Sequence, residues 1–292
     1  MNEFKKYHPI VNFTYFLCVI GFSMFLMHPV SLFVSFFAVV LYLLILKGKR
    51  EAFTRFWIIV PISICTAVIN SLFNHEGETV LGYLPSENPL TAESLFFGFA
   101  AAVMITSVVY HFSCYNEVMT SDKFIYLFGK IIPALSLVLS MVLRFVPKLI
   151  KRLKEIINVQ KCIGRDISRG SLWQRMKLAV KIISILITWS LESSVETADS
   201  MKSRGYGLSG RTAYSIFHFD KRDYMALFWI LITSAFVIAG TLCGFLYYRY
   251  FPSFAMTWKS AGAIASQTAY LMLCLTPIII EVRENYRWNS LK

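Results

Sequence analysis

The sequence predicts an all-α integral membrane protein of about six transmembrane helices, with two long amphipathic helices on the cytoplasmic side inserted before the last two spans. Of its 292 residues, 56% are hydrophobic and only 16% are charged. The mean hydropathy of +0.57 lies far to the apolar side of an ordinary soluble domain. The apolar residues form segments of bilayer length, while the basic residues concentrate in one central block.

Six apolar segments meet or approach the ~20 residues that a membrane-spanning helix needs. They are residues 10–27, 30–46, 56–73, 95–112, 224–247 and 261–280. His28 and Pro29 make so short a break that the first two segments should form a tight helical hairpin. Lysines before the first segment resemble a signal peptide, but no small-x-small cleavage site follows, so we expect this helix to stay.

Lysine and arginine in the short loops predict the orientation. Basic residues precede the first span and follow the second in KGKREAFTR, so both places should be cytoplasmic. Residues 74–94 contain four glutamates and no lysine or arginine, so this loop should lie outside. With residues 248–260 as a second outer loop, both termini are predicted to be cytoplasmic.

Residues 124–143, FIYLFGKIIPALSLVLSMVL, are long enough to span, yet a single crossing would put the basic block that follows outside. Lys130 and Pro133 interrupt this run, which favours a kinked helix along the inner leaflet. An additional crossing, making the number of spans odd, is the alternative. The predicted regions are therefore 1–123 with about four spans, 124–222 on the cytoplasmic side, and 223–292 with about two spans.

Residues 144–222 hold 16 of the 29 lysines and arginines. The stretch RFVPKLIKRLKEIINVQK has the period of an amphipathic helix, with Leu149, Leu153, Ile156, Ile157 and Gln160 on one side and Lys148, Lys151, Arg152 and Glu155 on the other. A second helix is predicted over 172–202. Its apolar run, 182–191, is too short to cross a bilayer, so it should lie under the membrane or against other helices.

No residue pattern indicates catalysis or metal binding. Glu192, Glu196 and Asp199 share a helix face, but no histidine is near in sequence and Lys202 follows, so a solvated or ion-paired face is expected. The six cysteines are scattered singly, and the five histidines are too widely spaced for a metal site and are expected at interfaces or in loops. Phosphate-binding loops and nucleophile motifs are absent from the sequence.

Two pairs of small residues within predicted spans have the spacing of membrane helix contacts. They are Gly98 with Ala102 and Gly240 with Gly244. Packing within this chain is the expected role of both pairs, and contact with a partner helix is the alternative.

The run ETADSMKSRGYG from Glu196 to Gly207, followed by Arg211-Thr212 and by KRDY at the start of a span, resembles the transmembrane T component of energy-coupling factor (ECF) transporters, the CbiQ/EcfT family. The upstream RFVP from Arg144 and the opening His8-Pro9 are also similar to that family. The resemblance covers about residues 8–247 and is strongest from 144 to 224.

In that family, two coupling helices each end in an Ala-Arg-Gly-like triplet. Ser203-Arg204-Gly205 matches it with serine in place of alanine. By position, the other triplet falls at Cys162-Ile163-Gly164, where isoleucine stands in place of arginine. Arg165, Arg169 or docking through an apolar surface are the alternatives that could supply the missing contact.

The resemblance implies a non-catalytic subunit of an ATP-driven importer in a bacterial cytoplasmic membrane. Its implied partners are two ABC ATPase subunits, which would hold ATP and Mg, and a small membrane S component that binds a vitamin, a vitamin precursor or a transition-metal ion. It implies no cofactor or metal on this chain and no nucleic acid. From the residues alone, a membrane scaffold that binds anionic lipid or nucleic acid through the basic block is the alternative.

Overall fold

The computed structural model describes residues 3–83, 89–129, 133–166, 168, 170–208, 217–252, 255–256 and 260–290. The chain divides into two compact units. One, which we call the bundle, consists of Met1–Thr120 and Phe217–Lys292, and the other, the helix-pair unit, consists of Ser121–Ile216.

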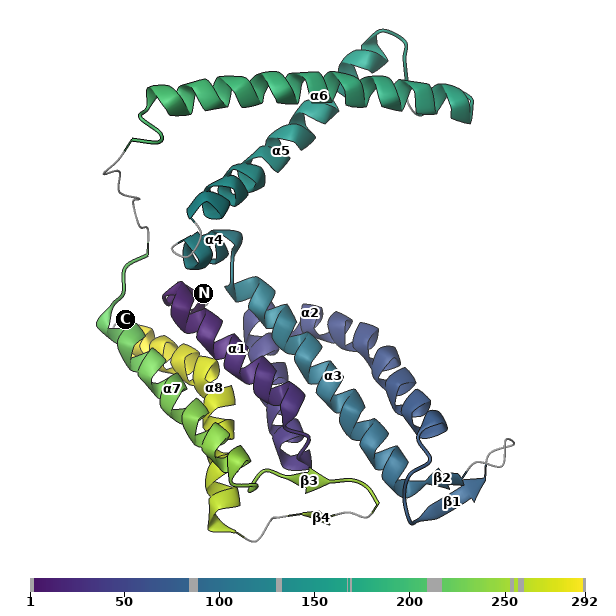
Figure 1. Ribbon diagram of the computed structural model, residues 1–292, viewed down its shortest axis with the longest axis vertical. Coiled ribbons are helices and arrows are strands. Elements are labelled where there is room, and N and C mark those ends of the chain that lie inside the picture. Colours follow the sequence, from purple (N-terminus) through teal and green to yellow (C-terminus); the bar gives the residue numbers. More distant parts are fainter. Residues whose placement is uncertain are drawn as a thin grey trace. The chain divides into compact units, whose positions relative to one another are not determined.

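The described residues of the bundle form helices and two short antiparallel hairpins, in agreement with the predicted all-α class (Figure 1). Its helices are η1 (Phe4–Lys6), α1 (Pro9–Phe25), α2 (Pro29–Phe73), α3 (Ala92–Val118), α7 (Lys221–Leu242) and α8 (Ala261–Ser290). Its hairpins are β1 (Val80–Tyr83) with β2 (Pro89–Thr91), and β3 (Tyr248–Arg249) with β4 (Ala255–Met256).

Histidine followed by proline starts both of the first two helices. His8 and His28 are N-cap residues whose side chains accept hydrogen bonds from the amides of Ile10 and Val30, each at 3.3 Å. The proline after each cap suits the first helical position, where no amide partner is needed. These caps produce the helical hairpin that the sequence predicts.

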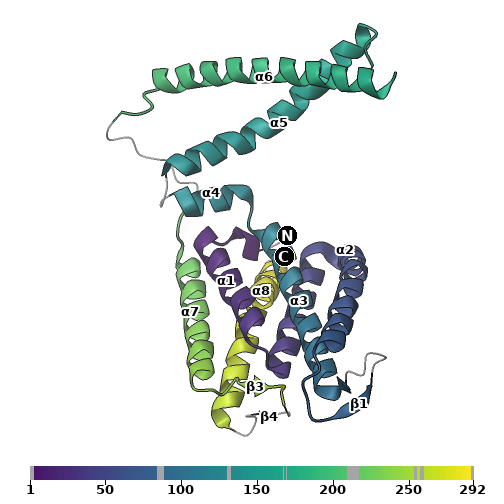
Figure 2. The same ribbon diagram turned by 45° about the vertical axis from the view of Figure 1, so that its right-hand side comes forward.

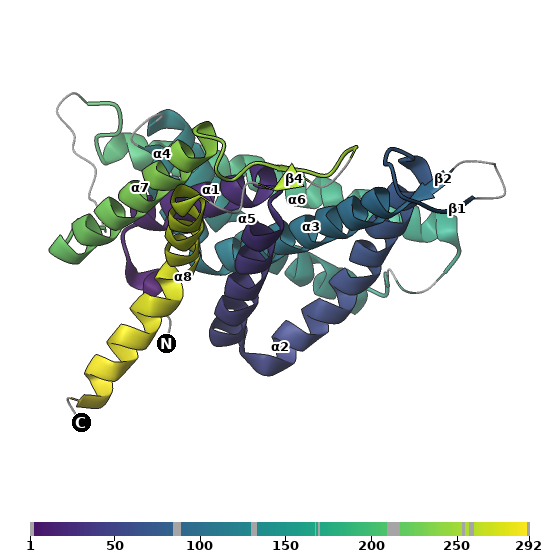
Figure 3. The same ribbon diagram turned by 90° about the horizontal axis from the view of Figure 1, so that it is seen from below.

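The helix α2 consists of two helical limbs joined at a bend, which is visible in Figure 3. Gly48 interrupts the helical backbone with φ 77° and ψ 168°. The two limbs correspond to the predicted spans at 30–46 and 56–73, and the basic stretch KGKREAFTR covers the bend.

The bundle gathers the predicted inner segments at one end and the predicted outer loops at the other. Glu117, at the end of α3, lies 3.6 Å from Lys5 and 3.4 Å from Lys47. At the opposite end the ring of His28 meets Tyr248, and the Tyr250 hydroxyl donates to the Met27 carbonyl at 2.8 Å. This grouping agrees with the alternation of sides read from the loop charges.

Five helices among the described residues are long and apolar enough to cross a membrane. They are Pro29–Glu51, Ala92–Val118, Leu172–Ser203, Lys221–Leu242 and Ala261–Arg287. Pro9–Phe25 and Ile59–Phe73 are shorter apolar helices. Length and composition thus admit Leu172–Ser203 as a span, although its central apolar run alone is too short for one.

The helix-pair unit contains α4 (Ser121–Gly129), α5 (Pro133–Cys162) and α6 (Leu172–Ser203). The described residues of the predicted segment 124–143 belong to α4, up to Gly129, and to α5, from Pro133. α5 begins well before Arg144, and Pro147 therefore lies inside it. Figure 2 shows α5 crossing α6.

Candidate functional site

The candidate site consists of the C-terminal ends of α5 and α6. These two helices cross and are held together by side-chain contacts. Trp189 of α6 stacks on Phe145 of α5 with ring centroids 6.2 Å apart. Lys148 and Arg152 also lie over the Trp189 ring, at 5.1 and 5.4 Å from its centroid. These cation–π interactions add to the stacking of the two rings and hold the helices together.

This contact corrects the predicted faces of α5. Lys148 and Arg152 were assigned to the side opposite the apolar one, but both border the contact with α6, and the Lys148 ammonium donates to Ser193 Oγ at 3.1 Å. Long basic side chains can cover an aromatic ring while their charges stay in water. Ile156 and Gln160 are buried as predicted.

The α5 end has a Schellman cap, in which a glycine in the left-handed conformation closes two main-chain hydrogen bonds. Gly164 has φ 77°. Its amide donates to the Lys161 carbonyl at 3.0 Å, and the Arg165 amide donates to the Gln160 carbonyl at 2.9 Å. Ile163 is therefore the C-cap residue of α5.

The α6 end has the same cap. Gly205 has φ 78°. Its amide donates to the Lys202 carbonyl at 3.0 Å, and the Tyr206 amide donates to the Met201 carbonyl at 3.0 Å. Arg204 is the C-cap residue.

Matching the caps aligns the two triplets residue by residue. Ile163 occupies the position of Arg204, and Arg165 occupies that of Tyr206. Arg165 is therefore two positions away from the place where α6 presents its arginine. Arg169 lies outside the described residues.

The side chains at both ends are available for contact. Ile163 is 63% exposed, and Cys162, Arg165, Ser203 and Arg204 are also exposed. The Ser203 hydroxyl donates to the Ser200 carbonyl at 2.9 Å. The Arg204 guanidinium has no hydrogen bond or ion pair with another described residue, so its donors are uncommitted.

The acidic face of α6 has no metal-binding geometry. Glu192, Glu196 and Asp199 are exposed, and no group of metal-ligating side chains occurs within the described parts of the chain. These carboxylates form a solvated face, one of the two forms expected for them.

The small residues differ in their surroundings. A Cβ on Gly98 would lie 2.8 Å from the Ala67 carbonyl oxygen of α2, and one on Gly240 would lie 2.7 Å from Ser266 Cβ of α8. Ala102 is buried. Gly244 does not have the predicted packing role. It lies beyond the end of α7 with φ 76°, and a Cβ there would meet nothing within 4 Å.

The bundle contains a buried polar cluster that no pattern in the sequence indicates. Ser35 Oγ lies 2.7 Å from Ser23 Oγ and 3.1 Å from His111 Nε2, while Ser23 Oγ lies 3.2 Å from the Tyr270 hydroxyl. His111 is therefore buried between helices, contrary to the interfacial or loop position expected for it. These hydrogen bonds link α1, α2, α3 and α8.

Comparisons with known proteins give consistent matches. The family model for the cobalt transport protein CbiQ matches residues 6–214, more than half of the chain. The energy-coupling factor transporter transmembrane protein EcfT of Bacillus selenitireducens is 38% identical over 111 residues, which are 38% of this chain and 41% of that protein. EcfT of Lactobacillus helveticus is 37% identical over 109 residues, or 37% of this chain and 39% of that one. EcfT 1 of Listeria monocytogenes is 37% identical over 109 residues, or 37% of this chain and 41% of that protein. The chain thus aligns with about two fifths of the length of these curated relatives.

Proposed function

The chain belongs to the CbiQ cobalt transport protein family, and from this membership we propose that it is the transmembrane T subunit of an energy-coupling factor importer. In this role it links two cytoplasmic ABC ATPases to a small membrane S component that carries the substrate. It is a multi-pass membrane protein, and we place both termini and the ends of α5 and α6 on the cytoplasmic side. ATP and Mg are bound by the ATPases, and this chain has no catalytic residue.

The observation that carries this proposal is the pair of identically capped, exposed helix ends in one crossed helix pair. Each cap satisfies its last carbonyls through main-chain bonds. The side chain at each C-cap position is therefore free to contact another protein.

Arg204 suits a contact with an ATPase. A cation near a helix C-terminus complements the negative end of the helix dipole. Its planar guanidinium can donate to a carboxylate or to main-chain carbonyls of a partner. Since the guanidinium has no partner among the described residues, binding breaks no existing interaction.

Ile163 makes the α5 end different in kind. With isoleucine at the position of Arg204, this end would dock by burying apolar surface. Arg165 lies beside that contact and does not replace the missing arginine, since the cap places it in the position of Tyr206.

The helix pair gives a route for transmitting movement. ATP binding would close the ATPase pair and displace the ends of α5 and α6, and the contact around Trp189 would couple the two helices. α6 also has exposed apolar side chains that suit contact with a membrane-embedded S component: Met176, Val180, Ile183, Ile187 and Leu191. Movement of these surfaces would tilt the S component and release a vitamin, a vitamin precursor or a transition-metal ion inward.

Copurification from native membranes, followed by an uptake assay in proteoliposomes, tests this function. The full chain should recover two ATPases and a small membrane protein, and Arg204→Glu should weaken ATPase recovery and abolish uptake. Lys181→Ala is the matched control, because it removes an exposed charge from α6 far from its end. Normal assembly and uptake by the Arg204→Glu variant would refute the assignment.

The same preparation distinguishes a scaffold function. The basic block from 144 to 222 would then bind acidic lipid or nucleic acid in a salt-labile manner. Recovery of such ligands without any ATPase would favour the scaffold.

A further inference from the structure

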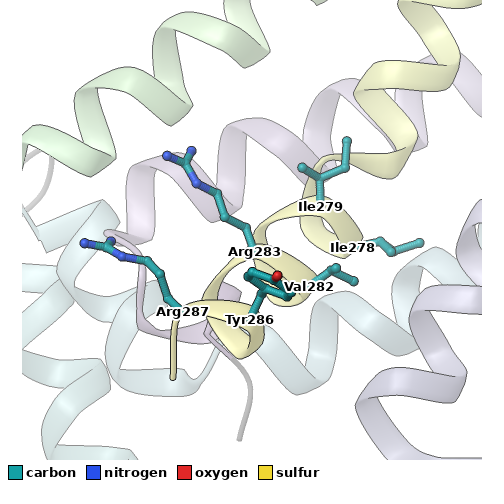
Figure 4. A pocket seen from close by; sticks show the side chains of 6 residues that line it. All are labelled: Ile278, Ile279, Val282, Arg283, Tyr286 and Arg287. Carbon is teal, nitrogen blue, oxygen red and sulfur yellow. The ribbon is translucent and has the colours of Figure 1, made fainter. Parts of the chain in front are cut away.

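A shallow groove of about 490 Å³ runs along the C-terminal part of α8. Its lining residues are Ile278, Ile279, Val282, Arg283, Tyr286 and Arg287. Figure 4 shows Arg283 and Arg287 extending to the same side of the helix, with the Tyr286 ring between Arg287 and Val282. Apolar side chains and arginines thus form consecutive parts of one surface.

The groove lies where α8 changes from apolar to charged sequence. The isoleucines belong to the predicted span at 261–280, and the arginines follow it within two turns. Glu281, on another side of the helix, is buried and accepts a hydrogen bond from the Glu3 amide at 2.9 Å. Val282 and Tyr286 are exposed, so this part of α8 is attached to the bundle on one side and open on the other.

The charges at this end of the bundle are unevenly compensated. Lys5, Lys6, Lys47 and Arg222 each have a carboxylate oxygen within 4.0 Å. Arg283 has no hydrogen bond or ion pair with another described residue. Arg287 lies 3.7 Å from Glu284, and its side chain is 72% exposed.

We propose that this groove binds an anionic phospholipid of the inner leaflet. Arg283 and Arg287, one helical turn apart, hold the phosphate, and the Tyr286 hydroxyl donates a further hydrogen bond. Ile278, Ile279 and Val282 contact the first part of an acyl chain. The apolar lining favours a lipid over free phosphate, which has no apolar part to bury. Binding here is independent of the transport function.

Native mass spectrometry of the full chain in detergent tests the site with phosphatidylglycerol and phosphatidylcholine. The wild type should bind phosphatidylglycerol preferentially, and Arg283→Gln/Arg287→Gln should weaken that binding by about 30-fold. This change corresponds to about 2 kcal/mol, or about 1 for each arginine near the membrane surface.

Arg50→Gln is the matched control, because Arg50 is exposed on the predicted inner side and has no ion pair with another described residue. A general attraction of basic residues for acidic lipid would make this variant lose as much binding as Arg283→Gln alone. Equal losses, or unchanged binding by the double variant, would overturn the site.

Inorganic phosphate separates the two possible sources of the anion. Added at millimolar concentration, it should leave the bound phosphatidylglycerol in place, whereas Val282→Ser should weaken lipid binding. Displacement of the lipid by phosphate, or full binding by Val282→Ser, would refute a lipid site. Unchanged melting temperatures of all variants exclude unfolding as the cause of a loss.

Discussion

The ends of α5 and α6 carry different side chains on caps of the same kind. If these ends bind ATPases as proposed, the two contacts should respond differently to salt. We consider Arg204→Ala and Ile163→Ala, each of which removes one C-cap side chain. Neither change should affect folding by more than about 0.5 kcal/mol, as is usual for exposed positions. A loss of ATPase binding can then be attributed to the contact itself.

The magnitudes follow from the chemistry of each side chain. Losing a hydrogen bond to a charged group costs about 1.5–3 kcal/mol, so Arg204→Ala should weaken binding by roughly 10- to 150-fold at low salt. Ile163→Ala removes three carbons worth about 0.8 kcal/mol each when fully buried. Because 63% of Ile163 is exposed and available for burial, the loss is about 1.5 kcal/mol, or roughly 10-fold.

Titration of the ATPases onto the chain in lipid nanodiscs at 0.1 M and 1 M salt measures both contacts. The Debye screening length falls from about 10 Å to about 3 Å over this range. The wild type and Arg204→Ala should therefore converge in affinity at high salt, while the deficit of Ile163→Ala persists. Equal salt dependence of the two deficits would show that the ends are chemically equivalent and refute the reasoning.

Three further changes test the packing described above. Gly240→Ala should lower thermal stability in detergent by about 1–3 kcal/mol through overpacking, because its Cβ would lie 2.7 Å from Ser266 Cβ; Ser266→Gly in the same chain should restore the melting temperature. Gly205→Ala should cost about 1–2 kcal/mol, since other residues resist the left-handed conformation; faster hydrogen exchange confined to the last turn of α6 would show this, and unchanged exchange would contradict it. Trp189→Ala should weaken the α5–α6 contact by roughly 2 kcal/mol, because it removes one ring pair and two cation–π contacts, and should speed tryptic cleavage of α5 and α6. Trp173→Ala, at an exposed position, is the control. Equally fast cleavage of both variants would count against the contact.

The sequence predicted the starts of α1 and α2 and both ends of α6, because those ends are determined locally. The prolines after His8 and His28 suit the first position of a helix, and Gly205 ends α6 with a positive φ. The hydropathy pattern predicted the two limbs of α2. The break between them at Gly48 is recognised only from the backbone dihedral angles of the structure. The G-x-x-x-G spacing of Gly240 and Gly244 does not reveal that α7 ends between them. Gly240 packs against α8, whereas Gly244 follows the helix end with a positive φ.

Contacts between helices were the harder part of the site to predict. Periodicity gave α5 an apolar face containing Ile156, but it did not identify Trp189 as the neighbour that Lys148 and Arg152 would cover. His111 could not be placed because its partners come from another part of the chain. The family resemblance pointed to Ile163 as the counterpart of Arg204, yet only the hydrogen bonds of the cap distinguish its place from that of Arg165.

The caps of α5 and α6 are built from main-chain bonds closed by Gly164 and Gly205. Nothing in the cap depends on the identity of the residue before each glycine. A single substitution at Ile163 or Arg204 can therefore change the side chain at the proposed contact without changing how the helix ends. The two positions can diverge independently during evolution, and the glycines beside them are the residues that this divergence must leave unchanged.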